Sequence, residues 1–209
     1  MSEAATGLVL QARDGARFRF DPGALCLEFL TTGGPGPLSR FEALHGPRDL
    51  ADWLAVSRLG VDPGEVRTGP DDAAAGRRLR DALWRLARAV IAGGPLPSGD
   101  TDEVNRAAAH PALVPRIAPD GARAWAPPVT GAQALSSIAR DAVDLLTGPD
   151  AGRVRECGAG DCPLVFVDLS RSGRRRWCSM ERCGNRHKVR ALRARREPVR
   201  TPSPGSPAG

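Results

Sequence analysis

Residues 157–196 read CGAGDCPLVFVDLSRSGRRRWCSMERCGNRHKVRALRARR and contain four of the five cysteines of the chain. Four residues separate Cys157 from Cys162, fifteen lie between Cys162 and Cys178, and four more precede Cys183. Each short loop can turn two thiolates inward, so this spacing predicts a tetrahedral structural zinc site. The segment has too little apolar content to fold alone, whereas bound zinc contributes on the order of 10 kcal/mol to such a module.

Two alternatives to this ligand set remain. The cysteines could be ordinary buried or redox-active thiols, or His187, four residues after Cys183, could replace one of them as a ligand. A catalytic zinc site is disfavoured, because four cysteines leave no open position for a water molecule. Zinc in a structural role is therefore the cofactor that we expect.

The fifteen residues between the two cysteine pairs predict a β-hairpin. Residues 164–169 are rich in β-prone side chains, and residues 170–173 have the composition of a turn. Residues 174–177 then return the chain to the second pair of cysteines. We expect this hairpin to bring the two pairs together.

The residues after the last cysteine predict a helix. Gly184 permits a left-handed turn, Asn185 can cap the helix, and good helix formers follow until Pro198. Val189 and Leu192 form a narrow apolar stripe, which we expect to seat the helix on the hairpin. The arginines then face outward, and the positive end of the helix favours the thiolate form of the ligands.

Positive charge is concentrated in the same part of the chain. The net charge of the 209 residues is +6, but residues 171–200 hold twelve Arg or Lys against two Glu, which leaves −4 for the remainder. A local excess of this size favours docking to phosphate groups. The alternative is a solvated basic tail, because abundant Arg, Ala, Gly and Pro are typical of a GC-rich bacterial genome.

The basic side chains form a candidate surface for nucleic acid. On the predicted helix, Arg186, Arg190 and Arg193 share one flank, and Lys188 and Arg195 share another. A helix of this kind can enter a major groove, where guanidinium groups contact phosphates and guanine edges. The residues that we expect to contact nucleic acid are Arg174, Arg175, Arg176, Arg186, Lys188, Arg190 and Arg193.

Up to about residue 150 the sequence predicts a mainly helical domain with minor β structure. Residues 17–31 are typical of a short strand and a turn that lead into a buried segment. Periodicity and end signals predict helices over residues 46–60, 71–94, 100–109 and 130–149, and a small hairpin around residues 119–121. The clearest signals are the apolar face of Leu79, Leu83 and Leu86, and a capping box formed by Thr130 and Gln133.

The fold class is therefore α+β, mainly α. We expect a helix-rich N-terminal domain with a small β element, followed by a small zinc module made of a β-hairpin and a helix. The expected parts are an N-terminal segment (1–16), the helical domain (17–150), the zinc module (151–197) and a disordered tail (198–209).

The sequence favours neither an enzyme nor a membrane protein. His45 and His110 are isolated, and no nucleophile–base set, phosphate-binding glycine loop or paired-carboxylate motif is legible. Cys26, in an apolar run, is interpreted as a buried thiol rather than a nucleophile. No stretch approaches the roughly 18 apolar residues of a membrane span, and the N-terminus lacks the order of a secretory signal. We expect a soluble cytoplasmic protein.

Residues 157–196 also resemble a known family, the CGNR zinc finger, whose name is spelled by Cys183, Gly184, Asn185 and Arg186. The stretches FVD and RRRWCSM that precede it fit as well. In that family the finger follows an ABATE domain, a helix-rich module of stress-response transcription regulators, and residues 17–150 are similar to it in length and order. The segment ALCLEFLTT, residues 24–32, is similar to its opening segment, with Glu28 and Thr31 replacing the acid and Asn expected there.

The resemblance implies DNA binding by the finger and a sensory or partner-binding role for the larger domain. The leading hypothesis is a bacterial transcription regulator whose helical domain dimerises, senses a small molecule or contacts another protein. The second is an RNA- or ribosome-associated module, which is disfavoured because Trp177 is the only aromatic residue beside the basic cluster. The third is an enzyme in the helical domain, with the finger as an accessory.

Overall fold

The computed structural model describes residues 7–12 and 14–196 of the chain. Helices form about half of this part and its sheets are two-stranded, so the predicted α+β, mainly α class is confirmed. The predicted disordered tail, residues 198–209, lies outside the described residues. No helix in the described part combines the length and the apolar character needed to cross a bilayer.

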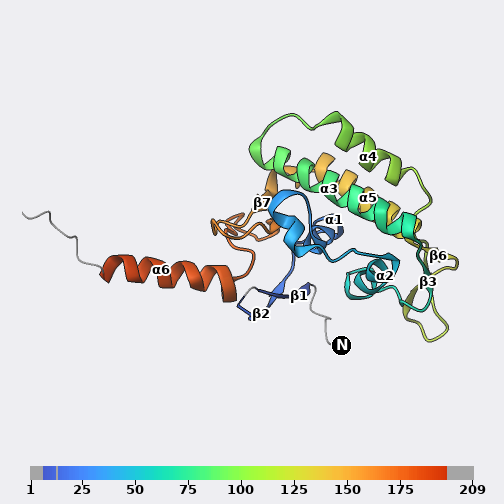
Figure 1. Ribbon diagram of the computed structural model, residues 1–209, viewed down its shortest axis with the longest axis horizontal. Coiled ribbons are helices and arrows are strands. Elements are labelled where there is room, and N and C mark those ends of the chain that lie inside the picture. Colours follow the sequence, from blue (N-terminus) through green and yellow to red (C-terminus); the bar gives the residue numbers. More distant parts are fainter. Residues whose placement is uncertain (1–6, 13, 197–209) are drawn as a thin grey trace, which may run out of the picture.

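Packed helices form the body of the molecule (Figure 1). Three of its helices, α3, α4 and α5, pack on one another, and α1 and α2 pack against α3 and α5. The bounds are α1 Leu25–Phe29, α2 Pro47–Val56, α3 Pro70–Ala92, α4 Ser98–Ala108 and α5 Gly131–Thr147. The helices predicted over residues 71–94, 100–109 and 130–149 are thus confirmed.

The end signals of α3 act as the sequence predicts. Its apolar face of Leu79, Leu83 and Leu86 is buried against the other helices. Asp72 accepts a hydrogen bond at 2.8 Å from a backbone N–H that precedes the helix, and this satisfies one of the free N–H groups at the helix start. Gly93 ends the helix in the left-handed conformation, with φ of 66°.

α5 begins with the predicted capping box and runs through the centre of the core. Gln133 donates its backbone N–H to the Thr130 hydroxyl at 3.2 Å, and its side-chain oxygen accepts from the Thr130 N–H at 3.0 Å. Ile138 and Ala142 have no exposed surface. Apolar burial along this face therefore positions the helices of the body.

The buried segment predicted within residues 17–31 is α1, all of whose residues are buried. The Glu28 carboxylate accepts hydrogen bonds from the backbone N–H and Nε of Arg58, at 2.9 and 3.3 Å. The backbone N–H of Cys26 donates to Asp141 at 2.8 Å. Burial, with the nearby Asp141, raises the pKa of the Cys26 thiol well above its usual range, and the prediction that this thiol is buried is confirmed.

Two local predictions need adjustment. α2 ends at Val56 rather than at Gly60, because Ser57 is extended and the chain turns at Gly60, where φ is 57°. The hairpin predicted around residues 119–121 is confirmed by β4 (Pro115–Ile117) and β5 (Arg123–Trp125). A parallel pair, β3 (Val66–Arg67) with β6 (Val129–Thr130), is not predicted because two residues carry no strand signal.

A buried ion pair that the sequence does not indicate joins α3 to the chain before α2. Arg80 is 1% exposed, and its guanidinium donates to both carboxylate oxygens of Glu42, at 2.7 and 2.8 Å. The Thr32 carbonyl accepts a further bond at 3.2 Å. Such a pair orients its elements, because removing one partner leaves a buried charge without compensation.

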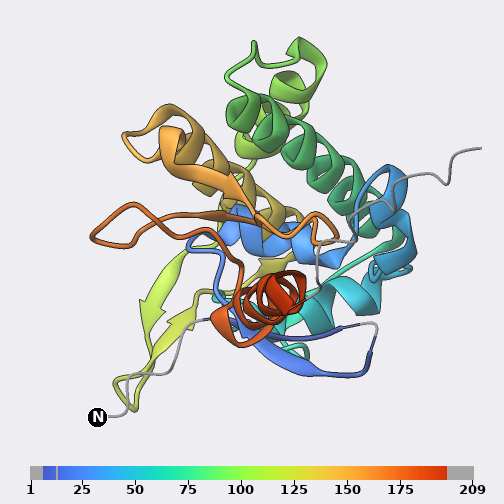
Figure 2. The same cartoon turned by 90° about the vertical axis from the view of Figure 1, so that its left-hand side faces the viewer.

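The strand predicted near residue 17 is confirmed as β2 (Arg17–Phe20), and it pairs antiparallel with β1 (Leu8–Gln11). The two strands lie beside the C-terminal part of the chain rather than beside the helical body (Figures 1 and 2). Phe18 and Phe20 of β2 are buried in a cluster with three of the C-terminal cysteines. The N-terminal hairpin therefore supplies apolar cover to a module more than 130 residues away in the sequence.

The hairpin predicted between the cysteine pairs lies elsewhere. β7 (Val154–Glu156) pairs antiparallel with β8 (Val165–Val167), so the first cysteine pair lies in the loop between these strands. The prediction that residues 174–177 form the return strand is wrong. Val154 and Val167 are buried in the main core, which explains why β8 pairs with the upstream segment rather than with consecutive arginines.

Candidate metal centre and basic surface

The structure brings together the four cysteines that the spacing predicts as ligands. Their Sγ atoms all lie within 4.8 Å of one another, and the Sγ of Cys178 is 3.7 Å from that of Cys162 and 3.5 Å from that of Cys183. A tetrahedral zinc ion with Zn–S bonds of about 2.3 Å places its sulfurs about 3.8 Å apart. Four thiol donors at this spacing fit a structural zinc ion.

The first cysteine loop follows β7 directly. The N–H of Cys157 donates to the carbonyl of Leu164 at 2.9 Å, and the N–H of Cys162 donates to that of Ala159 at 2.9 Å. Gly158 donates its N–H to the Arg176 carbonyl at 2.8 Å, and a Cβ atom at Gly158 would lie 3.2 Å from that oxygen. The glycine thus allows residues 174–177 to pass close to the loop.

The second loop leads into a single helical segment, η4 (Met180–Gly184) followed by α6 (Asn185–Arg196). Cys183 lies in its first turns, and the N–H of Cys178, just before it, donates to the Cys157 sulfur at 3.4 Å. The sulfurs therefore lie near the positive end of the helix, as predicted, which favours thiolates.

The predicted roles of Gly184 and Asn185 are wrong. Gly184 is not left-handed, since its N–H donates to the Ser179 carbonyl at 3.1 Å in a wide helical turn. Glycine suits this position because a Cβ atom at residue 184 would lie only 2.7 Å from the Met180 sulfur. Asn185 does not cap the helix start, because its side-chain nitrogen donates back to the Glu181 carbonyl at 3.3 Å within a continuous helix.

Contacts among the sulfurs move the pKa values of Cys157, Cys162 and Cys178 in different directions. Hydrogen bonds from Cys162 and Cys178 lower the pKa of Cys157 to about 2. The same contact with Cys157 raises the pKa of Cys162 to about 12 and that of Cys178 further still. Four thiolates at this separation therefore need a cation among them, and zinc is a cation that prefers such a set.

Arg186 links the first loop to the second. Its guanidinium forms two bonds to Asp161, at 3.0 and 2.9 Å, and donates to the Cys183 sulfur at 3.5 Å. Burial opposes ionisation of Asp161, but Arg186 and Arg190 outweigh it and lower the pKa of that carboxyl group. The sequence predicts that Arg186 contacts nucleic acid. In the structure its guanidinium instead contacts Asp161 and Cys183 of the same module.

Arg175, also predicted to contact nucleic acid, turns inward. Its guanidinium lies 4.1 Å from the centre of the Phe166 ring and donates to the carbonyls of Asp21 and Cys178, at 2.9 and 2.7 Å. Burial lowers the pKa of this arginine despite nearby acids. The contact to Asp21 joins the module to the N-terminal hairpin.

Asp168 organises the arginine-rich loop, a role that sequence reasoning missed. It is 2% exposed and accepts hydrogen bonds from the N–H groups of Ser170 and Arg175, at 3.0 and 2.9 Å. A hydrogen bond from the Ser170 hydroxyl, together with these two backbone bonds, lowers the pKa of its carboxyl group. A lone acid directly before the turn was the available signal in the sequence.

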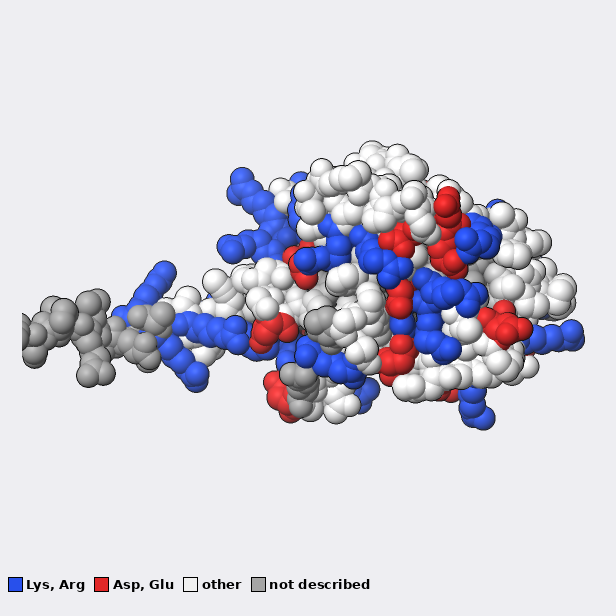
Figure 3. Space-filling model, turned by 45° about the horizontal axis from the view of Figure 1, so that its top comes forward, with Lys and Arg blue, Asp and Glu red and all other residues white. Residues whose placement is uncertain are grey.

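The other predicted basic residues, Arg174, Arg176, Lys188, Arg190 and Arg193, are exposed. α6 points away from the body in Figure 1 and is seen end-on in Figure 2, and many Lys and Arg side chains lie along the projecting arm in Figure 3. The arm therefore presents positive charge to solvent on several sides.

The prediction that Val189 and Leu192 seat α6 on the hairpin is wrong. They are 47% and 50% exposed. The apolar side of the module is already covered by Phe18 and Phe20. His187, the alternative zinc ligand, instead packs edge-on against Trp177, with ring centres 4.7 Å apart.

Two family models match the chain. The ABATE family, described as "Putative stress-induced transcription regulator", matches residues 23–149, which is more than half of the chain. The CGNR zinc finger matches residues 153–196, the part that contains all four clustered cysteines. A search of curated proteins gives no significant match.

Proposed function

Because the chain belongs to the ABATE family and carries a CGNR zinc finger, we propose that it is a transcription regulator that docks on duplex DNA through α6 and the adjoining loop. The observation that carries the proposal is a basic helix that projects from a zinc-held base. A helix about 10–12 Å across fits a major groove about 12 Å wide. On this proposal the protein acts on the chromosome, in the cytoplasm.

The exposed and the internal arginines have different roles in this proposal. Arg175 and Arg186 hold the module together, so they act on DNA binding through the position of α6. Arg190 and Arg193, on one flank of α6, and Lys188, on another, have exposed side chains that can reach phosphates. Arg190 pairs weakly with Asp161 at 3.4 Å, a contact that phosphate can replace.

A groove beside α6 adds a residue from outside the finger. It has a volume of about 450 Å³ and separates the helix from the turn of the β1–β2 hairpin. Arg17 lines its far side and Arg190 and Arg193 line the helix side. Arginines on both walls favour a phosphate backbone as the occupant, so we include Arg17 in the DNA-contacting surface.

Duplex DNA is favoured over RNA by the aromatic side chains. RNA readers stack unpaired bases on exposed aromatic rings. Among the described residues of the finger, Phe166 is buried, and Trp177 is half-buried beneath Arg176 and His187. Neither of these two rings is therefore fully open to an unpaired base.

The test is fluorescence anisotropy of a labelled duplex over a series of salt concentrations. We expect binding to weaken as salt rises, and the double variant Arg190→Gln/Arg193→Gln to reduce the slope of log K against log salt by about 1 for each arginine removed. Arg48→Gln is the matched control, since Arg48 lies on α2 with its side chain 91% exposed. Three results would overturn the proposal: duplex affinity that does not change with salt, a slope of log K against log salt that is unchanged in the double variant, or tighter binding to structured RNA than to the duplex.

A further inference from the structure

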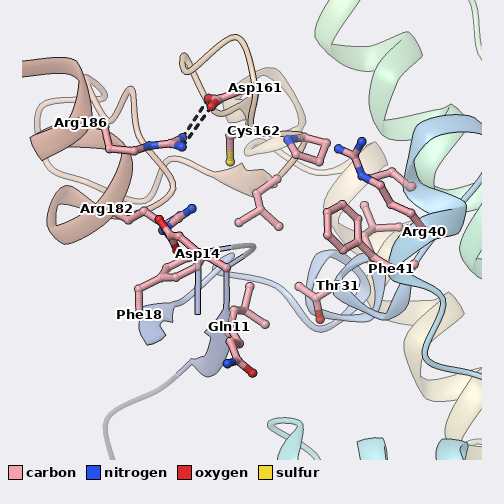
Figure 4. Close-up of a pocket in the computed structure, with 17 residues that line it drawn as sticks. Gln11, Asp14, Phe18, Thr31, Arg40, Phe41, Asp161, Cys162, Arg182 and Arg186 are labelled. Atoms are coloured by element: carbon pink, nitrogen blue, oxygen red, sulfur yellow. Dashed lines mark hydrogen bonds and ion pairs between the residues drawn. The ribbon is translucent and has the colours of Figure 1, made fainter. Parts of the chain in front are cut away.

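A cleft of about 560 Å³ lies where the N-terminal hairpin, the segment after α1 and the first cysteine loop meet (Figure 4). This volume is within the range of small-molecule sites. Its lining is largely apolar and comes from all three segments: Leu10 and Phe18, then Leu30, Leu38 and Phe41, then Leu164. An apolar body of the size of a two-ring aromatic compound fits such a lining.

Among the guanidinium and carboxylate groups that line the cleft, one positive charge is left without a partner. Arg182 pairs with Asp14 at 3.1 Å, and Arg186 pairs with Asp161 at 2.9 Å. Arg40, the remaining charged residue of the lining, has no carboxylate within ion-pair distance in the described part of the chain. Its guanidinium lies 4.8 Å from the centre of the Phe41 ring.

We infer that this cleft binds a small organic monoanion with an apolar body, such as an aromatic or medium-chain carboxylate, whose carboxylate pairs with Arg40. A single uncompensated guanidinium beside an apolar lining selects one negative charge and favours carboxylate, which it can bind with two hydrogen bonds. A dianion such as a phosphate monoester would leave a negative charge against Asp14 and Asp161. A neutral compound would leave Arg40 unused.

The position of the cleft connects this ligand to the finger, a step that rests on the proposed function. One wall is the first cysteine loop, from Asp161 to Leu164, and Arg40 and Phe41 lie across the cleft from Arg182 and Arg186 in Figure 4. The Nε atom of Arg186 is buried without a hydrogen-bond partner in the described structure. A ligand that contacts both walls fixes the base of α6 against the body, so it changes duplex affinity.

The site is tested by calorimetric titration of the full-length, zinc-loaded protein without DNA. The probes are 1-naphthylacetate and octanoate, each compared with its uncharged amide. We expect at least one acid to bind tenfold or more tightly than its amide, and Arg40→Gln to remove that difference while Arg40→Lys keeps part of it. Arg48→Gln, a charge change at another exposed arginine, on α2, leaves both affinities unchanged.

Absence of binding by both acids, equal affinity of acid and amide, or an unchanged preference in Arg40→Gln would overturn the site. Because no DNA is present, a protein that fails to bind DNA can still pass this test. The coupling is tested by repeating the duplex titration with saturating acid. A shift in duplex affinity of threefold or more in the wild type, lost in Arg40→Gln, supports the coupling, and an unshifted curve refutes it.

Discussion

The helical body and the cysteine module are held by different forces. In the body, periodic apolar faces on α3 and α5 bury residues such as Leu79 and Ile138 completely. The module has few apolar residues of its own, and its valines in β7 and β8 belong to the core of the body. Its loops are fixed by sulfurs and by the polar contacts of Arg175 and Asp168. A projecting basic helix can thus be positioned by a metal centre with little apolar core beneath it.

The helical body and the cysteine module nevertheless share an interface. Phe18 and Phe20 of the N-terminal hairpin cover the sulfurs, and Arg88 of α3 forms an ion pair with Glu156 of β7. The metal centre therefore lies between the helical core and α6. Changes in the body and changes at the sulfurs should have separable effects on stability and on DNA binding.

The largest effect is expected from removal of one sulfur ligand. Cys183→Ser breaks the four-thiolate set, and structural zinc contributes on the order of 10 kcal/mol to such modules. We expect the zinc content to fall from one ion per chain and duplex binding to be lost, while circular dichroism still reports the helices of the body. Cys26→Ala, at a buried thiol outside the cluster, is the control and should retain zinc. Full zinc content and duplex affinity in Cys183→Ser would remove the distinction between the two regions.

The reverse experiment weakens the body alone. Ile138 has no exposed surface, so Ile138→Ala leaves a cavity among α5 and its neighbours. We expect the free energy of unfolding to fall by about 2–5 kcal/mol. Urea titration measures this, and the zinc content of the folded protein should stay unchanged. Loss of zinc from folded Ile138→Ala would show that the core of the body also holds the metal site.

Acid should weaken the body through Glu42. Burial opposes its ionisation, but hydrogen bonds from Arg80 outweigh this and lower its pKa below the ordinary 4.5. Since the unfolded chain then binds the proton more readily, the contribution is complete above about pH 4.5 and is lost as pH falls through the lower, folded value. Denaturant midpoints between pH 6 and 3 should therefore fall less steeply in Glu42→Gln than in the wild type. Parallel curves would mean that this ion pair adds nothing to acid stability.

The smallest effect is expected at Gly184, although it lies in the motif that names the finger. Its backbone is not left-handed, and a Cβ atom would meet only the end of the Met180 side chain and the Trp177 ring edge. Met180 is 53% exposed and can move aside. Because alanine also favours a helix, Gly184→Ala should change the free energy of unfolding by less than about 1 kcal/mol. The free energy of unfolding is measured by urea titration with zinc present. A larger loss would show that Met180 and Trp177 cannot move to make room for a Cβ atom at residue 184.

The body could be predicted in more detail than the module, for a physical reason. Leu79, Leu83 and Leu86 form a face that repeats over several turns, and the capping box of Thr130 and Gln133 acts within four residues. Such signals are local, so the sequence displays them directly. The ion pair of Arg80 with Glu42 joins positions 38 residues apart, and no local sequence pattern indicates this contact.

In the module, the cysteine spacing predicted the ligand set, and the contacts around it could not be predicted. Arg175 and Arg186 look like their exposed neighbours in the sequence, yet Phe166 and Asp161 turn them inward. The exposure of Val189 and Leu192 follows from cover supplied by the distant N-terminal hairpin. Residue type indicated the charge of this surface, whereas contacts made elsewhere in the chain decided which arginines remain on it.

Hydrogen–deuterium exchange of the full-length protein, with and without a zinc chelator, tests most directly whether sulfur ligation holds the module while apolar burial holds the body. We expect the chelator to abolish amide protection in the two cysteine loops and α6, residues 157–162 and 178–196, and to leave the protection of α3 and α5 within threefold of the untreated protein. Protection that persists in residues 157–162 and 178–196 without metal, or that disappears from α3 and α5 together with it, would show that the two regions are not held by different forces.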